Sequence, residues 1–104
     1  MKIGDDFYHQ GPGFYRSAIA PYEAAQKFNP NNAELNFKLG ECYLASTTKE
    51  KATGVLERAL RLDPTIDARV HYFLGQAYHL EMNWDKAIAE LSIFQKSATL
   101  IYKV

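Results

Sequence analysis

Apolar side chains recur along most of the chain at the three- and four-residue spacing of an α-helix. The most regular stretch covers residues 33–64 and reads A-E-L-N-F-K-L-G-E-C-Y-L, then, after one alanine, S-T-T-K-E and K-A-T-G-V-L-E-R-A-L-R-L-D-P. This pattern predicts two amphipathic helices joined by a short polar turn. The same spacing predicts an all-α chain with helices over residues 2–10, 15–28, 33–45, 49–62, 68–81 and 84–100, and no strand pattern competes.

Prolines and candidate N-caps agree with these boundaries. Pro30 and Pro64 cannot continue a helix, and each disfavours the helical conformation of the residue before it. Pro21 instead lies inside the second helix, where it removes the hydrogen bond to the carbonyl of Ser17 and predicts a kink or a restart. Polar residues suited to an N-cap precede the later helices: Asn31 with Glu34, Thr47 with Glu50, Asp67 and Asn83.

The chain contains three copies of one helix-turn-helix unit. The segments I-G-D-D-F-Y, L-G-E-C-Y-L and L-G-Q-A-Y-H align, with 36 residues from Gly4 to Gly40 and 35 from Gly40 to Gly75. Further positions fall in the same register: Ala18, Ala52 and Ala87; Tyr22, Leu56 and Leu91; Ala25 and Ala59; Asn29-Pro30 and Asp63-Pro64. A shared register of glycine, alanine and proline indicates a true internal repeat.

This pattern resembles the tetratricopeptide repeat, an antiparallel helix pair of about 34 residues. Residues 33–66 fit it without a gap, with Leu39, Gly40, Tyr43, Ala52, Leu56, Ala59 and Pro64 at positions 7, 8, 11, 20, 24, 27 and 32. Residues 68–101 fit through Leu91, but Phe94 replaces the small residue at position 27 and no proline follows. The first copy, about residues 1–32, starts inside its first helix and has two extra residues at 12–13.

The resemblance implies one domain over residues 1–104, a short right-handed α-α superhelix (solenoid) of three repeats. In such a unit we expect Gly40 and Gly75 to let the first helix approach the alanine of the second, Ala52 or Ala87. Tyrosine and leucine side chains would fill the surrounding space, and Ala59 would admit the next repeat.

Composition narrows the function. Lys plus Arg and Asp plus Glu number 12 each, and this lack of a basic excess argues against a nucleic-acid partner. No apolar run approaches the roughly 20 residues of a membrane span, so we expect no direct insertion. Residues 1–6 do not resemble a signal peptide, because no apolar stretch follows Lys2. The single cysteine, Cys42, excludes an internal disulfide.

No catalytic, cofactor or metal constellation stands out. Gly11-Pro12-Gly13 lacks the lysine and the strand of a phosphate-binding loop. Cys42 lies in a helix among apolar residues and is interpreted as a small packing residue. His71 and His79 are eight residues apart, which does not match a metal-binding pair one turn apart, and we expect His71 to be buried or half-buried. The chain is therefore predicted to be non-enzymatic and without cofactors.

The resemblance implies a binding groove lined by the first helix of each repeat. Carried over by register, this groove would be lined by Asp5, Tyr8 and His9; Glu34, Phe37, Lys38, Glu41 and Leu44; and Arg69, Tyr72, Gln76, His79 and Leu80. The aromatic residues would form a strip with charges of both signs beside it, which suits an extended peptide or a helix. Our site candidates are Tyr8, Glu34, Phe37, Lys38, Glu41, Arg69, Tyr72, Gln76 and His79. In the alternative, these side chains are only solvated or are covered by other parts of the same protein.

Repeat domains that clamp the C-terminal carboxylate of heat-shock chaperones need lysine, asparagine and arginine at five groove positions. This chain has Met1, Asp5, Lys38, Arg69 and Phe73 there. Only Arg69 carries a suitable charge, so we do not expect a co-chaperone.

Three further expectations concern the whole protein. The apolar tail over residues 97–104 predicts either a longer natural chain or a homodimer through the exposed terminal helix. The phrases N-F-K-L-G-E-C-Y-L and Y-F-L-G-Q-A-Y-H-L-E-M-N-W-D-K-A-I are also similar to the N-terminal repeat region of bacterial OmpA-family envelope proteins, which implies the periplasm, with the cytoplasm as the alternative. The main hypothesis is a protein-interaction scaffold. The alternatives are a structural spacer or self-assembly module and an accessory domain of an enzyme.

Overall fold

The computed structural model describes residues 2–102 and the side chains of residues 2–97. Its helices are α1 (Lys2–His9), α2 (Tyr15–Phe28), α3 (Ala33–Leu44), α4 (Ala52–Leu62), α5 (Arg69–Leu80) and α6 (Trp84–Tyr102), with single 3₁₀ turns at Pro12–Phe14 and Lys49–Lys51. No strand occurs within residues 2–102. The all-α class is confirmed, and the main change in a boundary is that residues 49–51 form a 3₁₀ turn before α4.

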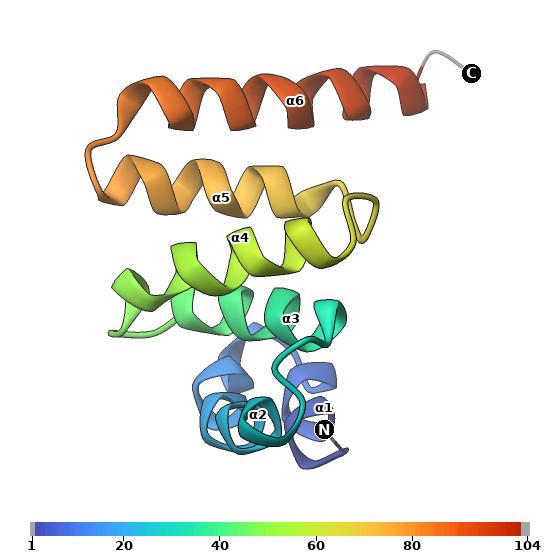
Figure 1. Cartoon of the computed structure of the whole chain (residues 1–104), viewed down its shortest axis with the longest axis vertical. Coiled ribbons are helices and arrows are strands. Elements are labelled where there is room, and N and C mark those ends of the chain that lie inside the picture. The colour runs from blue at the N-terminus through green and yellow to red at the C-terminus, as the bar shows by residue number, and fades with distance from the viewer. Residues whose placement is uncertain (1, 103–104) are drawn as a thin grey trace.

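The helices form antiparallel pairs that are stacked in the order of the sequence. Figure 1 shows α1 and α2 at one end, α3 and α4 in the middle, and α5 and α6 at the other end. The α5–α6 pair runs across the view while α2 is seen nearly end-on, so successive pairs are rotated against one another. The first helices also meet directly, since α3 contacts α5 as well as α4. This arrangement agrees with three stacked repeats.

The glycine register is used for close packing, and the nearest partner of each glycine is a large side chain of the second helix. A Cβ on Gly40 would lie 2.5 Å from Leu56, and one on Gly75 would lie 2.7 Å from Leu91. Gly4 faces the ring of Tyr22 in the same way. The nearest atoms to a Cβ on Gly40 all belong to Leu56, whereas a Cβ on Gly75 would also lie 3.5 Å from the carbonyl oxygen of Ala87. The large residue of the second helix packs directly over the glycine.

The helix ends differ from the expected caps by one residue. Asn32, rather than Asn31, caps α3, because its side chain accepts a hydrogen bond from the Leu35 amide at 2.9 Å. Thr47 does not cap the 3₁₀ turn, whose N-cap position is Thr48 and carries no side-chain cap. Asp67 accepts a hydrogen bond from the Arg69 amide at 2.9 Å, but the N-cap position of α5 is Ala68, one residue later, and it carries no side-chain cap.

Pro21 and Asn83 are the two remaining positions with a local expectation. Pro21 lies within α2, which continues from Tyr15 to Phe28, so the helix does not restart there. Asn83 precedes α6, and its main-chain carbonyl accepts the hydrogen bond of the Ala87 amide at 3.0 Å.

A tyrosine connects each repeat to the one before it. Tyr43 Oη on α3 donates to Glu23 Oε2 on α2 at 2.5 Å. One repeat later, Tyr78 Oη on α5 donates to Glu57 Oε2 on α4 at 3.2 Å. A lysine lies over each ring, Lys51 at 5.9 Å from the Tyr43 centroid and Lys86 at 5.5 Å from the Tyr78 centroid. The same polar joint is thus built at both repeat boundaries.

The core runs through all three pairs and contains one fully buried amide. Apolar residues from α2 to α6 form a single buried cluster. Inside it, Asn36 donates to the carbonyls of Pro30 and Asn32 and accepts from Gln26 Nε2 at 2.8 Å. These hydrogen bonds tie the α2–α3 turn to α3, so a polar side chain is buried without a lost partner.

The outer face of α6 remains apolar and open. Leu91 is 39% exposed, whereas Leu56 at the same repeat position of α4, a helix that packs against α5, is fully buried. Ile88 and Ile93 are 64% and 43% exposed on the same helix. The half-buried Phe94 packs on Tyr72, with ring centroids 5.4 Å apart. The tail side chains on which the expected homodimer was based, residues 98–104, lie outside the described side chains.

Candidate binding groove

The main hollow lies between the first helices of the repeats and the turn that leads into α5. It measures about 480 Å³, within the range of roughly 300–1,000 Å³ that is typical of ligand sites. Two of its lining residues belong to α1, four to the start of α3, and four to the α4–α5 turn and the first residue of α5. They are Tyr8 and His9; Ala33, Glu34, Phe37 and Lys38; and Asp63, Ile66, Asp67 and Arg69.

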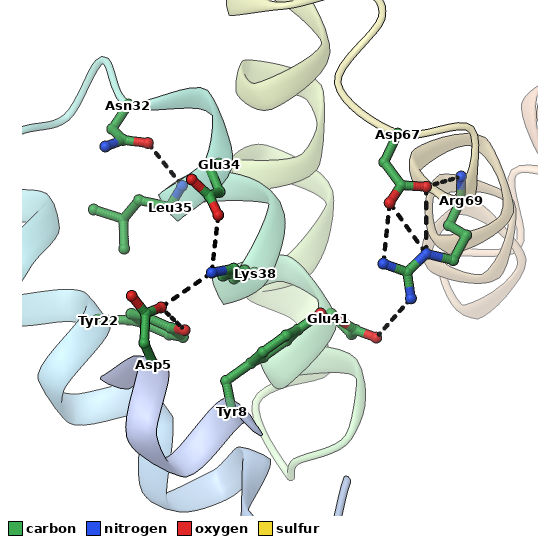
Figure 2. A network of polar contacts seen from close by, with 10 residues as sticks. All are labelled: Asp5, Tyr8, Tyr22, Asn32, Glu34, Leu35, Lys38, Glu41, Asp67 and Arg69. Atoms are coloured by element: carbon green, nitrogen blue, oxygen red, sulfur yellow. Dashed lines mark hydrogen bonds and ion pairs between the residues drawn. The ribbon is translucent and has the colours of Figure 1, made fainter. Parts of the chain in front are cut away.

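An ion-pair network fixes Lys38 on one side of the hollow. Lys38 Nζ lies 2.9 Å from Glu34 Oε1, one helical turn earlier, and 3.1 Å from Asp5 Oδ1 on α1. Asp5 in turn accepts a hydrogen bond from Tyr22 Oη at 2.6 Å, which anchors the network to the core. Figure 2 shows these contacts linking α1, α2 and α3.

A second network fixes Arg69 on the opposite side. Its guanidinium lies 3.0 Å from Asp67 Oδ2 and 3.9 Å from Glu41 Oε1. Glu41 also accepts the hydrogen bond of Tyr8 Oη, so the first helices of all three repeats are connected (Figure 2). The guanidinium carbon lies 5.6 Å from the centroid of the Phe37 ring, within range of a cation–π contact.

Hydrogen bonding favours the charged forms of Asp5, Lys38 and Asp67. Burial alone would raise the pKa of Asp5, but the hydrogen bonds from Tyr22 and Lys38 hold it below the usual value. Burial likewise opposes the charged form of Lys38, yet hydrogen bonds to Glu34 and Asp5 raise its pKa. Asp67 behaves like Asp5: hydrogen bonds from Arg69 outweigh burial and lower its pKa.

The predicted site residues divide between two hollows, and Tyr72 lines neither of them. Tyr8, Glu34, Phe37, Lys38 and Arg69 line the main hollow, and Glu41 is bonded to two of them. Gln76 and His79 instead line a smaller hollow of about 240 Å³, together with Leu44, Lys49 and Leu80. Tyr72 lies between neighbouring aromatic rings and is 39% exposed.

The expected aromatic strip is exposed only in part. Phe37 is only 4% exposed and packs against Phe73, with ring centroids 5.7 Å apart. The ring of Tyr8 stacks on Tyr15 at 5.0 Å and is half-buried. These rings form the floor of the groove and part of the core, so truncating Phe37 would disturb folding as well as binding.

Residues of the α4–α5 turn also line the hollow, although the sequence did not predict them as site residues. Asp63, Ile66 and Asp67 line the hollow, although the repeat register assigns groove positions to helices only. The segment D-P-T-I-D follows α4 directly, and a hydrogen-bonded turn at Asp63 folds it toward α3, with Thr65 donating to Asp63 Oδ1 at 3.0 Å. Two carboxylates in a short turn next to a predicted groove were the available signal.

The other candidate groups have structural roles. Cys42 is fully buried, and burial raises the pKa of its thiol to about 12, as a packing residue requires. His71 is half-buried, as predicted, and its Nδ1 lies 2.6 Å from Glu90 Oε2 on α6. Among the described residues, no three His, Cys, Asp or Glu side chains gather in a way that could hold a metal ion. Within residues 2–102, no helix is long and apolar enough to span a bilayer.

Stacked helix pairs with a hollow along the first helices define an α-helical repeat protein of the solenoid class. Comparison with protein-family models matches residues 4–65 to the tetratricopeptide repeat. The match covers more than half of the chain, and the chain belongs to the tetratricopeptide repeat family. Domains of this family are generally protein–protein interaction modules and are typical of non-catalytic scaffolds. A comparison with curated proteins found no match.

Proposed function

We propose that this domain is a scaffold that binds an extended peptide or a helix of a partner protein in the main hollow. The observation that carries the proposal is the hollow itself, which three sequence-distant segments form together. Lys38 and Arg69 stand on opposite sides of it, and the Phe37 ring lies in its floor. Apolar surface gives such a site affinity, and polar groups in fixed positions orient the ligand.

The charged side chains around the hollow are held in place before a partner arrives. Each of the two cations contacts two carboxylates, and each network includes a residue from a different repeat. Because little side-chain freedom remains to be lost, ordering these groups costs less on binding. This supports recognition by a preformed surface and makes the hollow a better candidate than the solvated alternative.

The test is to fill the hollow without changing its charge. Peptides are first selected from a random displayed library on the intact chain, and their affinities are then measured by fluorescence anisotropy. Ala33, the first residue of α3, lines the hollow, so Ala33→Trp is expected to weaken binding at least about tenfold by steric exclusion.

Ala20→Trp is the matched control, because Ala20 is an exposed α2 residue and is not among those lining the hollow. Circular dichroism confirms that both variants are folded. Equal binding by the Ala33→Trp variant, or the recovery of no binding peptide at all, would reject the groove as the recognition site.

Self-association through α6 is a second candidate, and the exposure of Ile88, Leu91 and Ile93 favours it. The proposed occupant is α6 of a second copy. α6 has Ser92 at the position of the joint glutamates Glu23 and Glu57, and Phe94 at the position of the small residues Ala25 and Ala59. The face of α6 therefore does not match the first helix of another repeat, and it is tested by the oligomeric state of the chain in solution.

A further inference from the structure

We infer that the main hollow selects a basic segment, in which an arginine or lysine side chain of the partner enters between α3 and the α4–α5 turn. This inference rests on the proposed function, because it names the chemistry of the ligand for the same site. It is carried by the distribution of charge, exposure and apolar surface around the hollow.

Carboxylates outnumber cations at the hollow. Three of its lining residues are acidic, Glu34, Asp63 and Asp67, whereas Lys38 and Arg69 are its only lysine and arginine. Two more carboxylates, Asp5 and Glu41, contact these same cations from outside the lining. Five carboxylates therefore surround the two cations Lys38 and Arg69.

This acidic excess is local to the hollow, because the chain as a whole carries 12 basic and 12 acidic residues. A cationic ligand would therefore be drawn to this hollow and not to the molecule in general. A concave surface lined by one excess sign concentrates the field and raises the local concentration of an oppositely charged partner.

The two cations of the hollow are already held by carboxylates, and one of these carboxylates is open to solvent. The Glu34 side chain is 62% exposed, whereas that of Lys38, its ion-pair partner, is only 12% exposed. Arg69 is more open at 51%, but Asp67 holds it through hydrogen bonds to Nε and Nη2. An acidic ligand would have to displace a carboxylate that is already in place. A basic ligand would instead add a cation to the carboxylate oxygens (Figure 2).

Apolar surface beside the carboxylates suits the aliphatic part of such a side chain. Ile66 and Ala33 line the hollow together with the half-buried ring of Tyr8. Lysine and arginine side chains bury their methylene groups along apolar surface while the charged end stays near polar groups. The hollow thus offers apolar surface for the methylene groups of a basic side chain and carboxylates for its charged end.

The experiment uses three synthetic peptides with the same aliphatic residues and with arginine, glutamine or glutamate at the alternate positions. Binding to the chain is measured by fluorescence anisotropy at low salt. We expect the arginine peptide to bind at least about tenfold more tightly than the glutamate peptide, with a preference that decreases as salt screens the charges. The double variant Glu34→Gln with Asp63→Asn should reduce affinity for the arginine peptide by roughly threefold to tenfold.

The matched control is Glu50→Gln with Asp85→Asn, which removes the same two charges at exposed residues that do not line the hollow. It should bind the arginine peptide as the unmodified chain does. Equal loss in both double variants, equal binding of all three peptides, preference for the glutamate peptide or no binding of any of them would overturn the inference. Library peptides that bind the hollow but are not basic would overturn it while leaving the proposed function intact.

Discussion

Glycine and a large side chain meet at the same place in every repeat. Gly4, Gly40 and Gly75 lie against Tyr22, Leu56 and Leu91, and two of these three partners are fully buried. Glycine carries a conformational cost of about 1 kcal/mol in a helix relative to alanine. That cost is offset here because the missing Cβ leaves room for the partner side chain to pack against the helix backbone. Each glycine is thus a requirement of packing between the two helices of a pair.

Two helical glycines should therefore respond to alanine with opposite sign. Gly40→Ala places a Cβ 2.5 Å from Leu56 and should destabilise the fold by about 1–3 kcal/mol through overpacking. Gly54→Ala, at an exposed position of α4, meets no atom within 4 Å and should stabilise the fold by about 0.5–1 kcal/mol. Urea unfolding followed by circular dichroism measures both changes. A stabilised Gly40→Ala variant would contradict this account of the packing.

The repeat register predicts which residues have a packing role. It does not predict which residues distant in sequence they contact. Gly40 was identified as a packing residue from its spacing, but Leu56 as its nearest partner depends on how the two helices are offset. Asn31 and Asn32 are both good caps, and only the path of the turn after Pro30 selects Asn32. The prediction of an exposed aromatic strip was wrong for Phe37 for a similar reason. The repeat register indicates which face of the helix Phe37 lies on, but not how deeply its side chain is buried.

At the scale of the helices, the repeats are joined by polar contacts as well as by apolar packing. Tyr43 and Tyr78 occupy the same repeat position, and each donates to a glutamate on the preceding helix. At the first copy this position is Phe7, which has no hydroxyl group. The sequence pattern identified the tyrosines as space-filling residues. The glutamates that accept their hydroxyl hydrogen bonds lie 20 and 21 residues earlier in the chain. The sequence pattern therefore did not predict these contacts.

Removing either hydroxyl should weaken the boundary between two repeats. Tyr43→Phe and Tyr78→Phe are each expected to destabilise the domain by about 0.5–1.5 kcal/mol, because a hydrogen bond to a charged acceptor is lost while the ring still packs. The half-buried glutamates remain accessible to water, which limits the cost. Thermal or urea unfolding of the single variants measures the effect.

Tyr72→Phe provides the comparison for these variants. The Tyr72 hydroxyl accepts only an exposed hydrogen bond from Gln76 Nε2 at 3.2 Å among the contacts described for it, so its removal should change stability by less than about 0.5 kcal/mol. If Tyr78→Phe proved no more destabilising than Tyr72→Phe, the tyrosine–glutamate contact would not be a stabilising joint.

At the scale of the whole molecule, both ends of the stack expose apolar side chains. Phe28 is 92% exposed and Ile3 is 64% exposed at the α1–α2 end, while Ile88 and Ile93 are exposed on α6. Stacked repeats bury their apolar faces against their neighbours, so end faces are left without that cover. The two ends differ in geometry, because Phe28 and Ile3 line a hollow and α6 presents a single helix.

Charge introduced at one end only can show which face associates. If two copies pair through α6, sedimentation should show a dimer that forms with increasing concentration, and Ile88→Glu with Ile93→Glu should make the chain monomeric by burying charge in an apolar contact. Phe28→Glu, at the opposite end, should leave that dimer intact, because a twofold α6 contact does not involve α2. Dissociation by Phe28→Glu as well would indicate a head-to-tail contact, which extends into open chains rather than closed pairs. A monomer at every concentration, or a dimer that survives both glutamates on α6, would exclude association through this helix.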